Sequence, residues 1–304
     1  MSKLCLPLKS VILAGFFALV TTLAAGSALA DKARLLSAIL VDKKTNMISV
    51  CEYRDGRFQV LKKYHATLGQ VKGDKEEEGD LKTPEGIYTF TSRSTPPALK
   101  AKFGVMAFSL NFPNTYDKMA GRTGSNIMLH ATDVPLRLKQ DYDSLGCVVV
   151  ENDQIREIQP YIRLGLTPIL IFSELTDDYL NPGQDATLKT FFESWIRDWE
   201  SKDLDKYMDH YHTDFSAPGK KNKEAWRSYK KQLNQQYSSI RIGPEDVLYY
   251  RHPKYSMITF TQNYQSKLKS GGWGHRSRGT KILYVAEEAG QPKIVAETYT
   301  NLMW

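Results

Sequence analysis

The sequence contains little cysteine, with three cysteines among 304 residues, and it has no internal repeat and no low-complexity tract. It also has no stripe of basic residues interleaved with aromatic residues, although its net charge is +7. Proteins that bind nucleic acids through such stripes are therefore excluded as a class. The mild basic charge suits a protein that works near an anionic surface.

The first thirty residues have the pattern of a secretory signal peptide. Lys3 and Lys9 form a basic start, residues 11–25 form an apolar run, and residues 28–30 read Ala-Leu-Ala, a small-residue cleavage site. An uncleaved membrane anchor is the alternative, but the apolar run is short for a membrane span. We predict cleavage after Ala30 and export. The removed segment (residues 1–30) holds two lysines and no acidic residue, so 274 residues with a net charge of +5 remain.

Two cysteines stay in the exported chain. Cys51 lies in a strand-like run, 47–53, in which its side chain is expected to point inward. A disulfide between Cys51 and Cys147 is therefore disfavoured, although export permits one. A free thiol in an exported protein needs a reason, and catalysis is one.

The stretch 126–152 holds the strongest chemical signal. His130 ends an apolar run, Ser144 and Gly146 precede Cys147, and three valines follow. A neighbouring base activates a thiol as a nucleophile, and imidazole titrates near neutrality. A glycine before the thiol lets the backbone turn sharply, so we expect the N–H groups of Gly146 and Cys147 to form an oxyanion hole. The alternative is a buried structural cysteine, because cysteine is among the most buried residue types.

The first half of the exported chain, residues 31–173, has the pattern of a mainly β domain, a sandwich or a barrel. Short apolar runs alternate with Gly, Pro and Asp turns, and a helix is expected after Asn152 or Asp153. The expected strands are 35–41, 47–53, 58–64, 86–92, 105–111 and 167–172.

The second half follows a polar linker, residues 174–184, that contains Pro-Gly. Residues 185–304 begin with apolar residues at helical spacing, and they predict helices capped at Asp203 and Asn222. Four strand-like runs come next, at 240–251, 256–266, 280–287 and 293–300. This order predicts an α+β domain. Four polar residues of this half are interpreted as core or rim groups, with a pocket as the alternative: Arg241, Gln262, Tyr264 and Glu297.

Four motifs in the first half resemble the L,D-transpeptidase (YkuD-type) family of cysteine enzymes, which act on peptidoglycan stem peptides. They read KTPEGIY at 82–88, SLNFPNTYD at 109–117, GRTG and IMLH at 121–130, and SLGC at 144–147. The resemblance covers about residues 34–173 and implies a sandwich- or barrel-like fold. It makes Cys147 the nucleophile and His130 the base. It also implies that the backbone carbonyl of Ala131 orients the imidazole ring.

The resemblance also suggests substrate-binding residues. Tyr116 and Asp117 are expected to line the cleft because of their family positions. Arg122 and Arg137 flank the site in the sequence, and arginine pairs well with the free carboxylates that peptidoglycan stems carry. Ser144 is expected to stabilise the turn before the thiol through backbone hydrogen bonds.

The chain departs from the family pattern at two places. Leu145 stands where the family usually has a histidine, and Val149 stands where an arginine is common. Because the upstream base His130 is present, these departures concern the handling of the substrate and not the chemistry.

The second half resembles the nuclear-transport-factor-like (SnoaL-like) cone fold, which hosts enzymes, binders and dimerisation modules alike. The pairing of the two domains resembles the L,D-carboxypeptidases that set cell shape in helical and curved Gram-negative bacteria, and Leu145 fits that subgroup. We therefore expect a periplasmic L,D-carboxypeptidase that removes the terminal D-Ala from tetrapeptide stems, with a second domain that binds wall glycan or dimerises.

No cofactor, metal or nucleic acid is implied, because a thiol, an imidazole and backbone amides suffice for acyl transfer. The run Glu76–Glu78 is interpreted as a solvated surface, and His210 and His212 do not face each other on a helix. Several other functions stay open. They are an L,D-transpeptidase that forms 3–3 cross-links, an enzyme that attaches or releases a lipoprotein, a sortase-like transferase, and a non-catalytic wall-binding protein.

Overall fold

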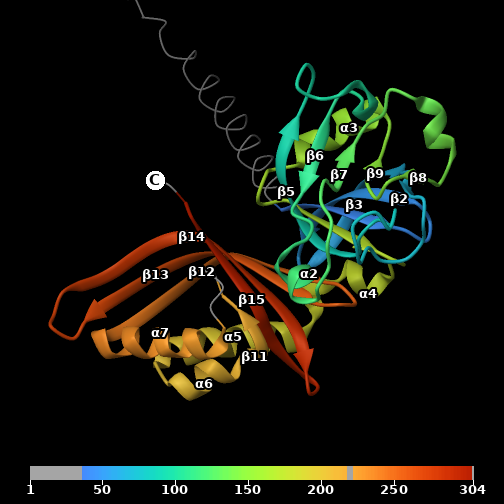
Figure 1. Cartoon of the computed structure of the whole chain (residues 1–304). Helices are drawn as coiled ribbons and strands as arrows, with labels where there is room; N and C mark the ends of the chain where they lie inside the picture. The colour runs from blue at the N-terminus through green and yellow to red at the C-terminus, as the bar shows by residue number, and fades with distance from the viewer. Residues whose placement is uncertain (1–35, 218–221, 303–304) are drawn as a thin grey trace, which may run out of the picture.

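The structure is a computed structural model, and it describes residues 36–217 and 222–302. The expected signal peptide and its cleavage site lie outside these residues. Figure 1 shows a β-rich lobe formed by the first half of the chain and a second lobe in which helices cover one face of a long curved sheet. The predicted fold class, a mainly β domain followed by an α+β domain, is confirmed.

An eight-stranded sheet forms the first lobe. Its strands are β1 (Ser37–Asp42), β2 (Met47–Arg54), β3 (Arg57–His65), β5 (Gly86–Ser94), β6 (Ala107–Leu110), β7 (Met128–His130), β9 (Val148–Val149) and β10 (Pro168–Phe172). Their order is β3-β2-β1-β10-β5-β6-β7-β9, with parallel pairing between β1 and β10 and between β7 and β9. The strands β4 (Leu68–Gly69) and β8 (Tyr142–Ser144) form a small second sheet. The short helices are α2 (Thr115–Met119), α3 (Asn152–Ile158) and α4 (Asp177–Leu180).

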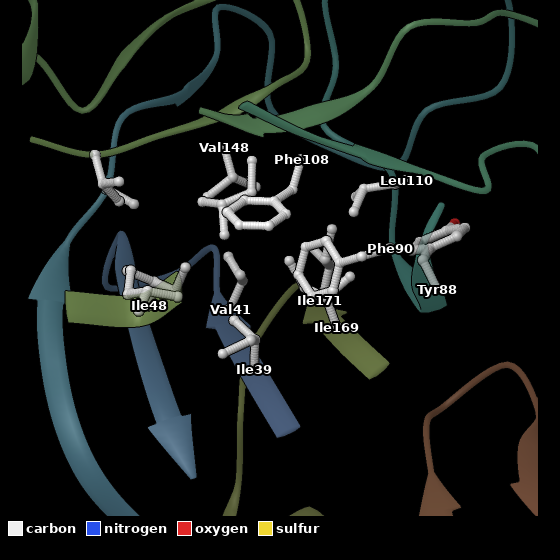
Figure 2. Close-up of a cluster of buried hydrophobic side chains, with 14 of the residues drawn as sticks. Ile39, Val41, Ile48, Tyr88, Phe90, Phe108, Leu110, Val148, Ile169 and Ile171 are labelled. Carbon is white, nitrogen blue, oxygen red and sulfur yellow. The ribbon is translucent and has the colours of Figure 1, made fainter. Parts of the chain in front are cut away.

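The large sheet curls so that its two halves enclose one hydrophobic core. Figure 2 shows side chains of β1, β2 and β10 facing side chains of β6 and β9 across this core. The buried residues include Ile39, Val41, Ile48, Phe108 and Val148. The folded-over sheet is the sandwich-like arrangement that the turn-rich sequence predicts.

Strand β1 is buried on both faces, because alternate residues of a strand point in opposite directions. Ile39 and Val41 enter the core of the first lobe, whereas Ala38 and Leu40 enter a second cluster that the two lobes share. The second lobe supplies this shared cluster with Tyr250, Tyr255, Met257, Tyr284 and Val295. The two lobes therefore pack through a continuous core. Full burial of each large apolar side chain in it contributes about 1.5–3 kcal/mol to the stability of the fold.

The second lobe is a five-stranded sheet with three helices on one face. Its strands are β11 (Tyr211–Ser216), β12 (Tyr237–Arg251), β13 (Ser256–Leu268), β14 (Trp273–Glu288) and β15 (Gln291–Asn301), in the order β11-β15-β14-β13-β12. Its helices are α5 (Ala186–Ser201), α6 (Leu204–Asp209) and α7 (Lys223–Gln236). The side chains of Asp203 and Asn222 cap α6 and α7, as predicted.

Tyr211 begins strand β11, where its hydroxyl donates to Glu297 of β15 and accepts from Trp195 Nε1. One local expectation was wrong: the N-cap of α3 is Glu151 and not Asn152 or Asp153. The Asn152 side chain instead bonds to the backbone of Val105 and Thr132, and it joins two loops beside the first sheet.

Candidate active site

His130 and Cys147 lie on neighbouring parallel strands. His130 ends β7, Cys147 immediately precedes β9, and Leu129 and His130 pair with Val148 and Val149. Leu129 and Val148 point into the core of the first lobe. Since side chains alternate along a strand, His130 and Cys147 project together from the opposite face of strands that are about 4.8 Å apart. The structure thus places the expected base and nucleophile on one face of two neighbouring strands, with Cys147 two positions before Val149, the residue opposite His130.

The His130 ring is held by the backbone and by an aromatic neighbour. Its Nδ1 lies 2.5 Å from the carbonyl oxygen of Ala131, the residue that the sequence analysis assigned to this role. The Phe103 ring meets the imidazole edge to face, with 4.9 Å between the ring centroids. When Nδ1–H donates to the carbonyl, Nε2 is the basic nitrogen.

Burial lowers the pKa of His130 to about 4, and the positive charges of Arg137 and Lys102 act in the same direction. The Cys147 pKa is raised, chiefly because the surrounding protein desolvates the thiolate. A backbone hydrogen bond from Met128 opposes this shift. The resting pair is therefore a neutral thiol beside a neutral imidazole, with the thiol 3.6 Å from the carbonyl oxygen of Asn126.

The turn before the thiol is tied by Ser144. The Ser144 hydroxyl donates to the Cys147 carbonyl at 2.7 Å and accepts from the Gly146 N–H at 3.1 Å. Ser144 thus holds the turn, as expected. The Gly146 N–H, however, was expected to face the reacting oxygen. In this structure it donates to the Ser144 hydroxyl instead. An oxyanion would have to compete with that hydroxyl for the Gly146 donor.

Arg137 lies close enough to influence both reacting groups, since its charge acts on the pKa of His130 and of Cys147. Its Nε and Nη2 each donate at 2.7 Å to Asp143, to a carboxylate oxygen and to the backbone carbonyl. The side chain is still 28% exposed, so a substrate carboxylate can approach its free edge. Of the two arginines named from the sequence, this is the one beside the site.

Arg122, Tyr116 and Asp117 do not line an open cleft, and this part of the expectation is corrected. Asp117 is fully buried, and it forms a capping box with the N-cap residue of α2. The Arg122 guanidinium pairs with Asp117 at 3.3 Å and with Asp74 at 2.6 Å. Tyr116 donates to the backbone of the second lobe. A buried guanidinium requires carboxylate partners, so these residues support the structure where the lobes meet.

The sequence analysis missed Lys75, Lys102 and Phe103, which act on the reacting pair through charge or ring contact. Lys75 lies in a loop, and Lys102 and Phe103 lie in a single 3-10 turn, Ala101–Phe103, so no periodic pattern in the sequence marked them. Leu145, the departure from the family pattern, is 68% exposed beside the nucleophile.

A cavity of about 490 Å³ lies in the second lobe between the helices and the sheet. Gln262, Tyr264 and Glu297 line it, whereas Arg241 lies outside and pairs with Glu200. Lys230 is buried here, 4.0 Å from the ring centroid of Trp199, and burial lowers its pKa to about 7. Three of the four polar residues named from the sequence are therefore cavity-lining groups.

Both described cysteines are free, so Cys51 and Cys147 do not form a disulfide. Within residues 36–217 and 222–302 there is no group of three or more His, Cys, Asp or Glu side chains that could hold a metal ion. The helices of these same ranges are all too short or too polar to cross a membrane.

Two buried histidines predict a loss of stability in acid. Burial lowers the pKa of both His130 and His252 to about 4, from 6.5. Between these values the unfolded chain binds a proton that the folded chain does not, so the stabilisation is complete above pH 6.5 and is lost as the pH falls to 4. Each histidine contributes about 3 kcal/mol of this loss.

Urea unfolding at pH 7 and at pH 4 tests this prediction. The His252→Gln variant is expected to lose about 3 kcal/mol less than the wild type between these two pH values. A variant of the exposed His275, His275→Gln, serves as the control and is expected to show the wild-type difference. An equal pH dependence for all three proteins would contradict the prediction.

Comparisons with known proteins agree with the fold. The family profile described as the L,D-transpeptidase catalytic domain (YkuD) matches residues 37–171, and the profile of the Cds6 C-terminal NTF2-like domain matches residues 187–298. The curated protein "Putative L,D-transpeptidase YafK" from Escherichia coli is 27% identical over 132 residues, which cover 40% of this chain and 47% of that protein. The chain thus matches about half the length of this curated relative.

Two solved structures resemble nearly the whole chain. Bd1075 from Bdellovibrio bacteriovorus is 34% identical, with a TM-score of 0.74, and the match covers 88% of this chain and 93% of that one. The helical cell shape determining protein Pgp2 from Campylobacter jejuni is 23% identical, with a TM-score of 0.66, covering 86% of this chain and 91% of that one, and it supports the fold. The chain therefore belongs to the L,D-transpeptidase (YkuD) family, in the form in which a Cds6-type NTF2-like domain follows the catalytic domain.

Proposed function

We propose that this protein is an exported cysteine L,D-carboxypeptidase that trims peptidoglycan tetrapeptide stems to tripeptides and so influences cell shape. The observation that carries the proposal is the placement of His130 and Cys147 on one face of neighbouring parallel strands, with Nδ1 held by Ala131. This arrangement leaves Nε2 to accept the thiol proton.

The proposed reaction has two steps. The Cys147 sulfur attacks the carbonyl carbon of the bond between diaminopimelate and D-Ala, while His130 Nε2 takes the thiol proton. The tetrahedral intermediate collapses, His130 returns that proton to the leaving amine, and D-Ala departs from a thioester. Water then attacks the thioester with His130 as the base, so the tripeptide carboxylate and the free thiol are produced.

The neutral resting pair gives this mechanism a specific feature. Because the imidazole and the thiol are both uncharged before the reaction, the proton moves only when the attack begins. The positive charge of Arg137 acts on both groups, and it would stabilise the negative charge that develops on the substrate oxygen. We assign to Arg137 the binding of a stem carboxylate, and to the aromatic cavity of the second lobe a part of the wall polymer.

Hydrolysis is favoured over transfer by the domain arrangement, which resembles that of cell-shape carboxypeptidases. The N-terminal pattern of two lysines, an apolar run and Ala-Leu-Ala supports export to the periplasm with cleavage after Ala30. Peptidoglycan is found in that compartment.

The product profile on a purified disaccharide tetrapeptide tests the proposal. We expect disaccharide tripeptide and free D-Ala in equal amounts, resolved by chromatography and mass spectrometry. Cross-linked dimer without tripeptide would identify an L,D-transpeptidase instead. No turnover of the tetrapeptide, together with retention of the protein on purified wall sacculi, would favour a non-catalytic wall-binding protein.

A further inference from the structure

The turn between β12 and β13, residues 252–255, reaches from the second lobe onto the catalytic domain. Tyr255 at its end is 3% exposed. Its hydroxyl donates to the Ile87 carbonyl at 2.9 Å and accepts from the Ile87 N–H at 2.8 Å and from the Asn114 amide at 2.8 Å. One side chain of the second lobe thus satisfies both backbone groups of a residue in β5.

Lys254, the preceding residue, holds both ends of a catalytic-domain segment, residues 74–85. Its ammonium group donates to the Glu85 carbonyl at 2.6 Å and contacts the Asp74 carboxylate, from which it is separated by 180 positions in the chain. Asp74 also accepts from the Glu85 N–H at 2.7 Å and pairs with Arg122 at 2.6 Å. The Lys254 side chain is 19% exposed, so its charge is partly shielded from water and its partners depend on it.

The segment 74–85 runs beside the nucleophile. A Cβ atom placed on Gly146 would lie 2.7 Å from the Lys82 carbonyl oxygen, so the two backbones are in contact next to Cys147. Lys75, near the other end of the segment, contributes positive charge at the Cys147 thiol. The segment contains no helix and no strand. Inside the segment Lys75 pairs with Asp80 at 2.6 Å, and the catalytic domain also holds it through Lys43 and Gly69, which bond to Thr83. The second lobe adds Lys254, which joins the two ends of the segment, Asp74 and Glu85.

We propose that Lys254 and Tyr255 are positioning residues of the catalytic site, through which the second lobe fixes segment 74–85 and, by its contact with Gly146, the turn that carries Cys147. In this arrangement the second lobe is part of the reaction apparatus as well as a possible binding module. The helix α2, which lies where the two lobes meet (Figure 1), carries Tyr116, whose hydroxyl donates to the Lys254 carbonyl and closes the same contact.

The test compares four variants of the full chain with the wild type. Lys254→Met removes the ammonium group, Lys254→Arg keeps a cation that can reach both partners, and Tyr255→Phe removes only the hydroxyl. Lys293→Met is the matched control, because Lys293 pairs with Asp209 of its own lobe, away from the catalytic domain. Three quantities are measured: kcat and KM on disaccharide tetrapeptide, the pH profile of Cys147 alkylation by iodoacetamide, and hydrogen exchange in residues 74–85.

Lys254→Met and Tyr255→Phe are each expected to lower kcat at least tenfold while KM changes less than threefold. Exchange in residues 74–85 is expected to rise at least tenfold, and the alkylation profile is expected to shift along the pH axis. Exchange in β1, β2 and β10 stays at the wild-type level. Lys254→Arg restores kcat to within threefold of the wild type, and Lys293→Met matches the wild type throughout.

Two results would overturn the proposal. One is an unchanged alkylation profile together with unchanged exchange in residues 74–85. The other is a rise in exchange that is equal across the whole catalytic domain, which indicates a general loss of stability. The kinetic comparison depends on the proposed function, but the alkylation and exchange measurements do not. If the wild-type protein does not turn over the tetrapeptide, the proposed function is rejected, and the alkylation and exchange measurements still test the positioning role. If Lys254→Met does not fold, Tyr255→Phe decides in the same way.

Discussion

Replacement of Cys147 by alanine is expected to lower kcat/KM on the tetrapeptide substrate by at least about 10⁴-fold. The sulfur forms the covalent bond of the proposed reaction, and no neighbouring group can replace it. The Ser144 hydroxyl, which belongs to the same turn, is engaged with the backbone of Gly146 and Cys147. The polar contacts of the thiol are weak, with the Asn126 carbonyl at 3.6 Å and with the backbone of Met128, so the free energy of unfolding is expected to change by less than about 1 kcal/mol.

Cys51 provides the matched control. It is fully buried, and burial raises its pKa to about 12, so its thiol is not available as a nucleophile. Cys51→Ala is expected to keep the wild-type kcat/KM and to lower the free energy of unfolding by about 1–2 kcal/mol through the lost packing. Turnover in the Cys147→Ala variant above about 1% of the wild-type rate would show that the thiol is not the nucleophile.

The reacting pair could be predicted from the sequence because its geometry is local. His130 and Cys147 belong to one stretch of the chain, and the pairing of β7 with β9 brings them together without any distant element. The role of Ala131 needs only a backbone carbonyl, so it follows from its place after His130. Backbone hydrogen bonds of Ser144 were expected, but that Gly146 supplies one of them was not. The direction of a single N–H group in a turn depends on backbone angles that the residue types do not specify.

The residues at the lobe interface were misassigned for the opposite reason. Tyr116 and Arg122 were expected to meet the substrate, but their partners Lys254 and Asp74 are far away in the chain. Asp117 is buried with them, bonded to Arg122 and to the N-cap residue of its own helix. The local sequence does not distinguish a polar residue that a distant partner buries from one that faces a substrate.

Strand β1 illustrates the same limit for the core. Its apolar run was recognised as a strand, but the sequence does not say that alternate residues serve two different cores. The fold class could therefore be predicted from patterns within each half of the chain. The packing between the halves could not be predicted, because it depends on contacts between residues far apart in the chain, such as Leu40 and Met257 of the shared cluster.

Replacement of Gly146 by alanine is the second large effect that we expect. Its φ of +121° lies in a region that L-residues rarely adopt, and the new Cβ would lie 2.7 Å from the Lys82 carbonyl oxygen. We expect the free energy of unfolding to fall by about 3 kcal/mol and kcat/KM to fall by at least about 100-fold. Urea unfolding gives the first quantity, and kinetics at a temperature where the variant is folded give the second.

The loss of activity follows from which of the two backbones can move. Lys82 is held on both sides, because its own N–H donates to Asp80 and the next residue, Thr83, bonds to Gly69 and Lys43. The turn before Cys147 therefore has to yield, and the sulfur moves away from His130. Gly165→Ala is the control, since Gly165 also has a positive φ, +75°, but open space at its Cβ position. It is expected to lose about 1–2 kcal/mol of stability and no activity. If both variants lose stability and keep full activity, the contact between Lys82 and Gly146 does not position the nucleophile.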